Sequence, residues 1–221
     1  MEIVATPNPA VGARRKHFIF NDEHEQLRES IRGFVTREFA PHAAEWEETT
    51  FPDEVFPKMG AQGFLGLDKP VEYGGEGGDY YASLVLGEEM VHAQSGGLAM
   101  GIAVHTDMAM PPILAFGTEE QKQEWVVPAI KGEKILCLGI TEPDAGSDVA
   151  GIKTRAVRDG DEYVINGSKT YITNGHRADF IVLVTKTDPG AGYDGFSLFL
   201  VDMDLPGVIR EKKLEKLGMH A

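Results

Sequence analysis

Hydrophobic residues in the first part of the chain recur at helical spacing. Five of them lie at positions i, i+4, i+7, i+8 and i+12 and would share one face of a helix. They are Leu27, Ile31, Phe34, Val35 and Phe39. Asn21 precedes this series and can cap the helix, because its side chain accepts a hydrogen bond from an N–H of the first turn. Pro41 ends or bends the helix, since proline removes a backbone donor.

Further helices are predicted up to about residue 131. They span residues 42–48, 52–59, 79–93, 97–116 and 118–130. Thr118 and Gln121 fit a capping box at the start of the last helix. The stretch 72–78 is a predicted loop, because its four glycines do not hold a helix.

Near Glu133 the hydrophobic pattern changes from helical to strand-like. The candidate strands are 135–141, 154–158, 162–165, 169–172, 180–185 and 196–201. Asp159-Gly160 and Asn166-Gly167 predict hairpin turns, in which both central residues take positive φ. The predicted fold class is therefore α+β, an all-α region followed by an antiparallel, β-barrel-like region. The expected divisions are a flexible leader at 1–16, a helical domain at 17–132 and a β-domain at 133–221 that is incomplete at its C-terminal end.

Composition narrows the class of protein. The 221 residues are 42% hydrophobic and 25% charged, which is typical of a globular protein with a sizeable core. The net charge of -14 argues against a nucleic-acid partner, because the polyanion would be repelled. The single cysteine, Cys137, excludes an internal disulfide, and its apolar neighbours predict a buried packing thiol.

No membrane span, signal peptide or metal site is expected. The most apolar region, 96–116, is interrupted by His105, Asp107 and a proline pair. The N-terminus lacks the apolar core of a signal peptide, so a soluble intracellular protein is expected. His92 and His105 have no metal-ligand partner at helical spacing, which favours structural or surface roles. The acidic residues of 45–48 are expected to form a solvated helix face.

The stretch 140–148, ITEPDAGSD, is the first candidate for chemistry. Pro143 should break the preceding strand, and Gly146 permits the close approach of another molecule. Thr141, Ser147 and free N–H groups would then face one concave turn, which suits an anionic or carbonyl group. Taken alone, the stretch is equally consistent with an ordinary loop.

Three further blocks follow in order: GIKT at 151–154, NGSK at 166–169 and YITNG at 171–175. Together with the first stretch they resemble the middle β-domain of acyl-CoA dehydrogenases, and the blocks at 63–66 and 73–75 resemble the N-terminal helical domain of that family. Without the resemblance, Thr173 and Asn174 would be interpreted as a β-turn, and Tyr171 as a core residue. The ordered set is much more specific than any one block.

The resemblance implies an activity. Members of this family use FAD to desaturate an acyl-CoA thioester to the trans-2-enoyl-CoA in fatty acid β-oxidation. A glutamate in a C-terminal four-helix bundle is the base, and electron-transfer flavoprotein accepts the electrons. This sequence ends before that bundle, so we expect an N-terminal part with no catalytic residue of its own. The complete form would be a homotetramer in the bacterial cytoplasm or the mitochondrial matrix.

The resemblance also implies site residues. Those expected to line the flavin ring are Leu138, Ile140 and Thr141 on one side and Tyr171, Ile172 and Thr173 on the other. Gly146 and Ser147 would lie by the pyrophosphate and the thioester arm, with Ser147 contacting the substrate. Asp144 stands where the family usually has glycine, so its charge should point to solvent.

Acyl length is indicated only weakly. The sequence resembles the long-chain members most, and the small or apolar residues of the helix near Ser95 would let a long alkyl chain pass. They are Gly97, Leu98, Gly101 and Ile102. Helical packing alone would explain the same residues.

Two alternative functions stay open. One is a flavoenzyme of the same fold, such as an acyl-CoA oxidase or nitroalkane oxidase, which slow reoxidation of the flavin by air would argue against. The other is a non-catalytic binding fragment.

Overall fold

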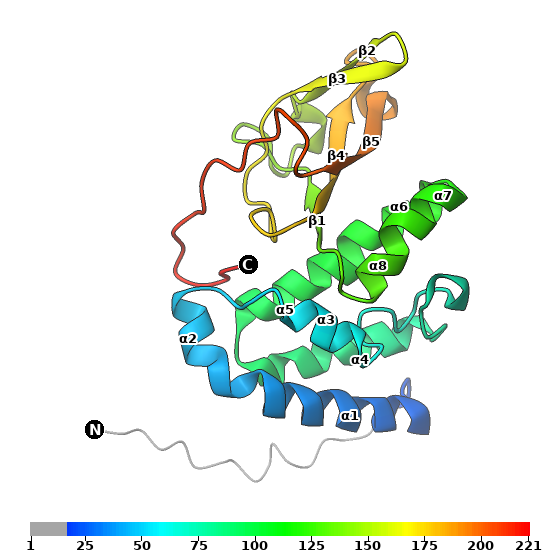
Figure 1. Ribbon diagram of the computed structural model, residues 1–221, viewed down its shortest axis with the longest axis vertical. Coiled ribbons are helices and arrows are strands. Elements are labelled where there is room, and N and C mark those ends of the chain that lie inside the picture. The colour runs from blue at the N-terminus through cyan, green and yellow to red at the C-terminus, as the bar shows by residue number, and fades with distance from the viewer. Residues whose placement is uncertain (1–16) are drawn as a thin grey trace.

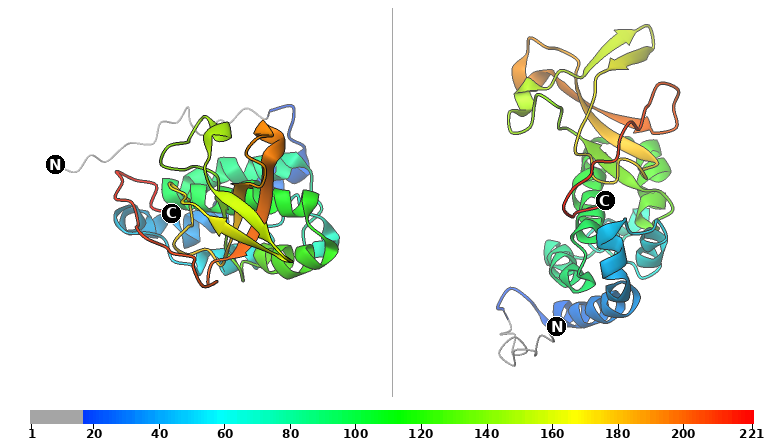
Figure 2. Two further views of the ribbon diagram at one scale, coloured as in Figure 1. Left: turned by 90° about the horizontal axis from the view of Figure 1, so that it is seen from above. Right: turned by 90° about the vertical axis from the view of Figure 1, so that its left-hand side faces the viewer.

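The structure is a computed structural model that describes residues 17–221, so the predicted leader at 1–16 lies outside the described residues. The helices pack side by side at one end of the molecule, and the strands form a sheet at the other end (Figure 1). The right-hand view of Figure 2 shows the same division along the long axis. The predicted order, helical region first and β-region second, is confirmed.

Eight α-helices build the first part of the described chain. They are α1 (Asp22–Glu38), α2 (Ala43–Glu48), α3 (Val55–Gly60), α4 (Tyr80–Glu89), α5 (Gly96–Ala103), α6 (Met110–Phe116), α7 (Glu119–Gln121) and α8 (Val127–Ile130). Two π-helical turns, Val104–Ala109 and Lys122–Val126, join α5 to α6 and α7 to α8. The predicted helices at 97–116 and 118–130 are therefore continuous, each with a widened turn in its middle.

Helix α1 begins, as predicted, at an Asn21 cap. The Asn21 side chain accepts a hydrogen bond from the His24 N–H at 2.9 Å, and the His24 ring accepts one from the Asn21 N–H at 3.2 Å. Ile31 and Val35 on the apolar face of α1 are fully buried in a cluster shared with α3, α4 and α5. Each such side chain contributes about 1.5–3 kcal/mol by burial, which holds the helices together.

The second part forms one five-stranded sheet. Its strands are β1 (Leu136–Gly139), β2 (Arg155–Asp159), β3 (Glu162–Asn166), β4 (Phe180–Lys186) and β5 (Phe196–Asp202). β4 is central: β5 pairs with it antiparallel along its whole length, and β1 pairs with it parallel from the register Leu136↔Phe180. β2 meets the end of β4 in a parallel bridge and forms an antiparallel hairpin with β3.

The sheet is mixed, which corrects the expectation of an antiparallel region. The chain returns from β1 to β4 through a loop, the β2–β3 hairpin and a long irregular segment, so the two strands can run in the same direction. The β2–β3 hairpin also packs against β5, since the rings of Tyr163 and Phe199 lie edge to face at 5.0 Å.

One predicted hairpin forms and the other does not. The turn after Asp159 joins β2 to β3, with positive φ at Gly160 (62°) but not at the next residue. The predicted hairpin at Asn166-Gly167 is wrong, and the predicted strand at 169–172 is irregular. The backbone there bonds to the loop after β1 instead of joining the sheet, since the Thr170 N–H donates to the Thr141 carbonyl.

The sheet rests on the helices through one apolar cluster. Leu136 of β1 and Phe180 of β4 face Met110, Ile113 and Ile130 of the helical region. The continuous helix Gly96–Phe116 lies in this interface and is, by length and composition, apolar enough to cross a membrane. Its interruptions at His105, Asp107 and the proline pair therefore do not make it too polar by composition, and half of the apolar segment is buried inside the protein, as in a core helix.

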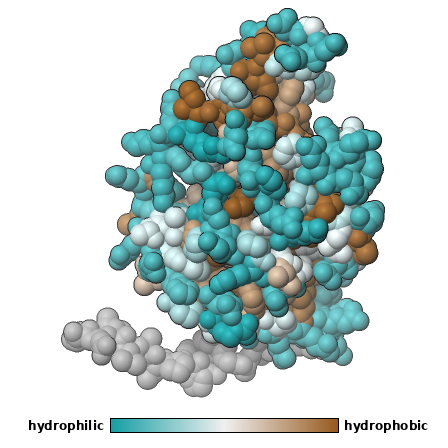
Figure 3. All heavy atoms as spheres, in the orientation of Figure 1, coloured by the Kyte–Doolittle hydropathy of each residue, from teal (hydrophilic) through white to brown (hydrophobic). Residues whose placement is uncertain are grey.

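Apolar side chains are also exposed over the strands, where Figure 3 shows apolar surface gathered at the top of the molecule. Val157 and Val164 form a facing pair on β2 and β3, and both are about half exposed. Contiguous exposed apolar surface is typical of interaction sites.

Candidate functional site

The two blocks singled out in the sequence meet in the structure. The Lys169 Nζ donates to the Ile140 carbonyl at 2.9 Å and to Oε1 of Glu142 at 2.8 Å. The Thr170 N–H donates to the Thr141 carbonyl at 2.9 Å. Segments 29 residues apart in the chain are thus joined side by side where β1 ends.

Glu142 is the centre of this junction. Its buried carboxylate accepts hydrogen bonds from Lys169, from the Thr154 hydroxyl at 2.5 Å and from the N–H groups of Lys153 and Thr154 at 2.6 and 2.9 Å. Burial opposes ionisation, but the Lys169 and Thr154 hydrogen bonds outweigh it and lower the pKa of Glu142 to about 2. Glu142 is therefore ionised and held in place. Its carboxylate connects the loop after β1 to Lys153, Thr154 and Lys169, and it is not suited to act as a catalytic base.

The loop beyond Glu142 turns its tip to solvent. Glu142 and Ala145 pair across the turn through two backbone hydrogen bonds, of 2.9 and 3.1 Å. The Asp144 side chain is 72% exposed and lies 2.9 Å from the Lys153 amine, so its charge points outward as expected. Gly146 is exposed, and a Cβ there would meet no atom within 4 Å. Packing among the described residues therefore does not require glycine at this position. The close approach of a ligand stays the predicted reason for a glycine at 146.

The second block has an unusual backbone. Tyr171 is 72% exposed and has a φ of 56°, a conformation that bulky residues rarely adopt. The interpretation of Tyr171 as a core residue is therefore wrong. Ile172 packs beside Cys137 and Ile181. The expected turn is present, since the Gly175 N–H donates to the Ile172 carbonyl at 2.9 Å.

The residues expected to bind flavin are available to a ligand. Each of them keeps some exposed surface, whereas Gly139, Glu142 and Ala145 between them are buried. The exposed or half-buried set is Leu138, Ile140, Thr141, Gly146, Ser147, Tyr171, Ile172 and Thr173. The hydroxyls of Thr141, Ser147 and Thr173 form no side-chain hydrogen bond with another residue in 17–221. These unpaired hydroxyls fit FAD, which carries many hydrogen-bonding groups.

The residues expected to bind flavin do not form one continuous surface. Leu138 faces the cluster against α6 and α8, and Ile140 packs with Ala145 and Val184 beneath the loop. No hydrogen bond joins Gly146 or Ser147 to the 171–173 segment among the described residues. The junction at Lys169 therefore aligns the two blocks, while a bound molecule would have to bridge their outer parts.

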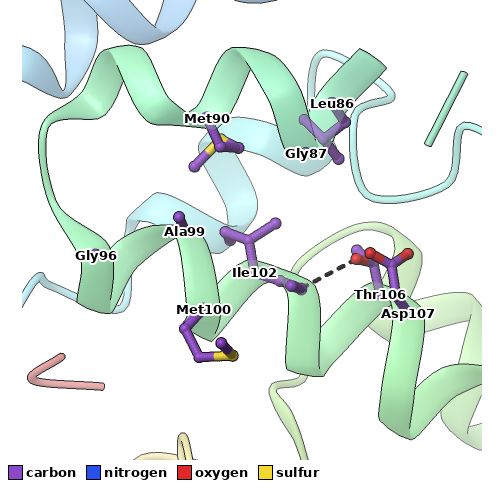
Figure 4. A pocket seen from close by; sticks show the side chains of 10 residues that line it. Leu86, Gly87, Met90, Gly96, Ala99, Met100, Ile102, Thr106 and Asp107 are labelled. Atoms are coloured by element: carbon purple, nitrogen blue, oxygen red, sulfur yellow. Dashed lines mark hydrogen bonds between the residues drawn. The ribbon is translucent and has the colours of Figure 1, made fainter. Parts of the chain in front are cut away.

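An apolar cavity of about 260 Å³ lies between α4 and α5 (Figure 4). It is lined by Leu86, Gly87, Met90, Gly96, Ala99, Met100, Ile102, Ala103, Thr106 and Asp107. Of the four residues expected to leave room for an alkyl chain, only Ile102 lines it. Leu98 is buried in the core, and Gly97 and Gly101 lie against other segments.

Sequence reasoning missed Asn174, which links the second block to the helices. Its side chain is fully buried, and Nδ2 donates to the Gly101 carbonyl of α5 at 2.8 Å and to the Leu136 carbonyl of β1 at 3.3 Å. The only feature of the sequence that could have indicated this role is the position of the asparagine directly after Tyr171-Ile172-Thr173. The residue tolerates its φ of 64° because asparagine enters the left-handed region readily.

Two other titratable groups are structural. His105 is fully buried between Ala129, whose carbonyl bonds Nε2 at 2.9 Å, and the Leu136 N–H, which donates to Nδ1 at 3.1 Å. Burial lowers the pKa of His105 to about 4, so the ring is neutral. Burial also raises the pKa of the Cys137 thiol to about 12, which confirms a packing role.

The acidic stretch 45–48 is only partly a solvated face. Ser95, the cap of α5, donates through its hydroxyl to Oε1 of Glu47 at 2.7 Å. Glu47 therefore ties α2 to the start of α5, which a charge pattern alone does not reveal.

Known proteins share this arrangement. Residues 21–133 match the family pattern of the acyl-CoA dehydrogenase N-terminal domain, and residues 137–221 match that of the acyl-CoA dehydrogenase middle domain. The mitochondrial long-chain specific acyl-CoA dehydrogenase of Sus scrofa is 39% identical over 214 residues, which is 96% of this chain and 49% of that protein. The short-chain specific acyl-CoA dehydrogenase of Clostridium acetobutylicum is 42% identical over 205 residues, 92% of this chain and 54% of that protein.

Solved structures agree in fold. A glutaryl-CoA dehydrogenase of Mycobacterium smegmatis, in complex with FADH2, has a TM-score of 0.85 and 33% identity, covering 92% of this chain and 51% of that one. The chain spans about half the length of the curated relatives it matches. Because the two family domains account for nearly all of the described residues, this chain belongs to the acyl-CoA dehydrogenase family.

Proposed function

We propose that this chain forms the flavin-binding part of an FAD-dependent acyl-CoA dehydrogenase that desaturates an acyl-CoA thioester to the trans-2-enoyl-CoA. The observation that carries the proposal is the junction of Lys169 with Ile140 and Glu142, which holds the two family blocks side by side. The relatives named acyl-CoA dehydrogenases, and the one solved with FADH2, support the same conclusion.

We call the eight residues expected to bind flavin the flavin bed. Their proposed roles differ according to the chemistry of their side chains. The hydroxyls of Thr141, Ser147 and Thr173 bind polar edges of the cofactor, and Ser147 also contacts the thioester arm. The side chains of Leu138, Ile140 and Ile172 exclude water on the apolar side, and the exposed Tyr171 ring covers a flavin face. FAD, when bound, accepts the β-hydrogen of the substrate as hydride. The residues of this chain orient the reactants, and no catalytic base is assigned among them.

The cavity between α4 and α5 is proposed to receive the alkyl chain of the substrate. Its lining is almost entirely apolar, with polar side chains only at Thr106 and Asp107. Long-chain and short-chain relatives are similar to this chain at nearly equal identity, so the preferred acyl length is left open. An electron-transfer flavoprotein as acceptor, a homotetrameric complete form, and a bacterial cytoplasmic or mitochondrial matrix location remain predictions.

A flavin titration tests the proposal. The 221-residue chain is added to FAD, and quenching of the flavin fluorescence is followed to saturation. We expect saturable binding to FAD and weaker binding to riboflavin, which lacks the pyrophosphate that Gly146 and Ser147 are proposed to contact. Absence of saturable FAD binding by the folded chain would contradict the proposed function. For a full-length form, rapid reoxidation of reduced flavin by air would favour the oxidase alternative.

A further inference from the structure

We propose that Asn174 is a positioning residue that couples the flavin bed to the apolar cavity between α4 and α5. Binding of FAD beside Thr173 would then change the surroundings of the cavity-lining side chains, although no cavity residue belongs to the flavin bed. The inference rests on the proposed flavin site, and it adds a physical connection between that site and the cavity.

The first support is the position of the Asn174 amide. It is fully buried, and its Nδ2 atom donates to carbonyls of two different elements, Gly101 of α5 and Leu136 of β1. Thr173, a proposed flavin contact, is the preceding residue in the chain. One side chain therefore joins the flavin-bed segment, the strand that leads into Thr141 and the helix that lines the cavity.

The second support is the close packing at Gly101. A Cβ on Gly101 would lie 2.6 Å from a ring carbon of Phe51 and 3.0 Å from Oδ1 of Asn174. Its neighbours along α5, Met100 and Ile102, both line the cavity (Figure 4). Close-packed protein interiors have low compressibility. A displacement of Asn174 therefore moves α5 at the level of the cavity rather than being absorbed by empty space.

The third support is that a second link from this segment, through Arg177, makes no hydrogen bond to α5. Arg177 donates to Asp53 at 2.9 Å and to the Thr50 hydroxyl at 2.5 Å, and its guanidinium lies 4.0 Å from the Phe51 ring centroid. Asp53 and Thr50 are not among the residues that line the cavity. Arg177 therefore reaches α5 only indirectly, through Phe51, whereas Asn174 donates a hydrogen bond directly to the Gly101 carbonyl of α5.

Native methionines allow a direct test. Met90 and Met100 line the cavity, while Met59 is buried in the helical core and Met203 packs below the sheet. The chain is labelled with methyl-13C methionine and titrated with FAD, and the methyl resonances are compared with flavin fluorescence in the same samples. We expect the Met100 resonance to shift along the FAD binding curve, and Met59 to stay in place.

The decisive variant is Asn174→Gly. Glycine accepts the φ of 64° without strain, so the change removes the amide and leaves the backbone conformation allowed. FAD should still bind, about 2- to 13-fold more weakly if the equivalent of one neutral hydrogen bond is lost from the ordering of the segment, and the Met100 shift at saturation should disappear. Asn166→Gly is the matched control, because Asn166 ends β3 on the surface and should leave both readouts as in the unaltered chain. If Asn174→Gly does not fold, Asn174→Ala also removes the amide donor and should likewise abolish the shift.

The outcomes separate this inference from the proposed function. Failure of the unaltered chain to bind FAD overturns both. Saturable FAD binding that leaves Met100 unmoved overturns the coupling alone. Retention of the full Met100 shift in Asn174→Gly also overturns it, because the shift would then come from direct contact with the cofactor.

Discussion

The amine of Lys169 lies 2.8 Å from Oε1 of Glu142, and both side chains are more than 90% buried. This pair connects the loop after β1 with the segment after β3, and a second donor contact from Lys169 reaches the Ile140 carbonyl. Buried pairs are expensive to break, because the remaining charge is left without a partner.

Replacing Lys169 by methionine should therefore destabilise the fold strongly. We expect the free energy of unfolding to fall by about 3–5 kcal/mol, the range for removing one member of a buried ion pair. Urea unfolding followed by circular dichroism measures it. Lys153→Met is the matched control: its amine pairs with Asp144, both side chains are more than 70% exposed, and the change should stay below about 1 kcal/mol. An equal loss of unfolding free energy in the two variants would show that the buried Lys169–Glu142 pair stabilises the fold no more than the exposed Lys153–Asp144 pair.

Acid should weaken the fold through His105. Its pKa is about 4 in the folded protein, against 6.5 in an unfolded chain, so the unfolded state binds the extra proton first as pH falls. The contribution is complete above about pH 6.5 and is lost progressively down to about pH 4, with a total of about 3 kcal/mol. Urea unfolding at several pH values between 7.5 and 4.5 measures the slope. His105→Gln should flatten it, whereas His92→Gln, at an exposed side chain, should not.

Substitution of Gly101 by alanine should destabilise the helical region. The added Cβ would lie 2.6 Å from Phe51, and overpacking of this kind costs about 1–3 kcal/mol. The control is Gly33→Ala in α1, where a Cβ meets nothing within 4 Å and alanine should stabilise by about 0.5–1 kcal/mol. Thermal unfolding of both variants decides the matter, and a rise in melting temperature for Gly101→Ala would contradict the close packing.

Thr173→Val should weaken FAD binding by about 0.5–1.5 kcal/mol, the net value of one neutral hydrogen bond. The hydroxyl makes no side-chain hydrogen bond to any other described residue, so its loss leaves the protein's own network intact. Flavin fluorescence titration measures the affinity. Thr170→Val, in the same segment but outside the proposed contacts, serves as control. Unchanged affinity in Thr173→Val would remove Thr173 from the flavin bed.

The 221-residue chain by itself should not desaturate acyl-CoA. Glu142, the buried carboxylate nearest the proposed flavin bed, is held ionised by four donors, and a base so stabilised is a poor proton acceptor. Anaerobic bleaching of the flavin absorbance with a long-chain and a short-chain acyl-CoA measures the activity. Bleaching at an enzyme-like rate would show that a base is present within these residues.

Features that depend on neighbouring residues were predictable from the sequence. The Asn21 cap involves groups three residues apart, and the change of hydrophobic period near Glu133 marks the start of the sheet. The blocks at 140–148 and 171–175 were recognisable because the order of their residue types is itself the signal. Whether those residues bind FAD is still a prediction, which the titrations above test.

Features that depend on contacts between residues far apart in the chain were not predictable from the sequence. The β-branched and aromatic residues of 169–172 favour a strand, but the buried contact of Lys169 with Glu142 outweighs that propensity and bends the segment aside. No pattern along the chain indicates which element a single lysine or asparagine will reach. The burial of Glu142 and Asn174 was therefore missed.

The sequence by itself determined the order of helices and strands, the caps and the family blocks, because these follow from local propensity and residue order. Only the tertiary structure decided that β1 and β4 run parallel, and that Ala99 and Ala103 rather than Gly97 and Gly101 line the cavity. The reason is physical: the direction of a strand and the face that a helix presents are set by packing against partners distant in the chain. The contacts that supply this packing energy join residues far apart in the sequence, so a short stretch of sequence does not include both partners.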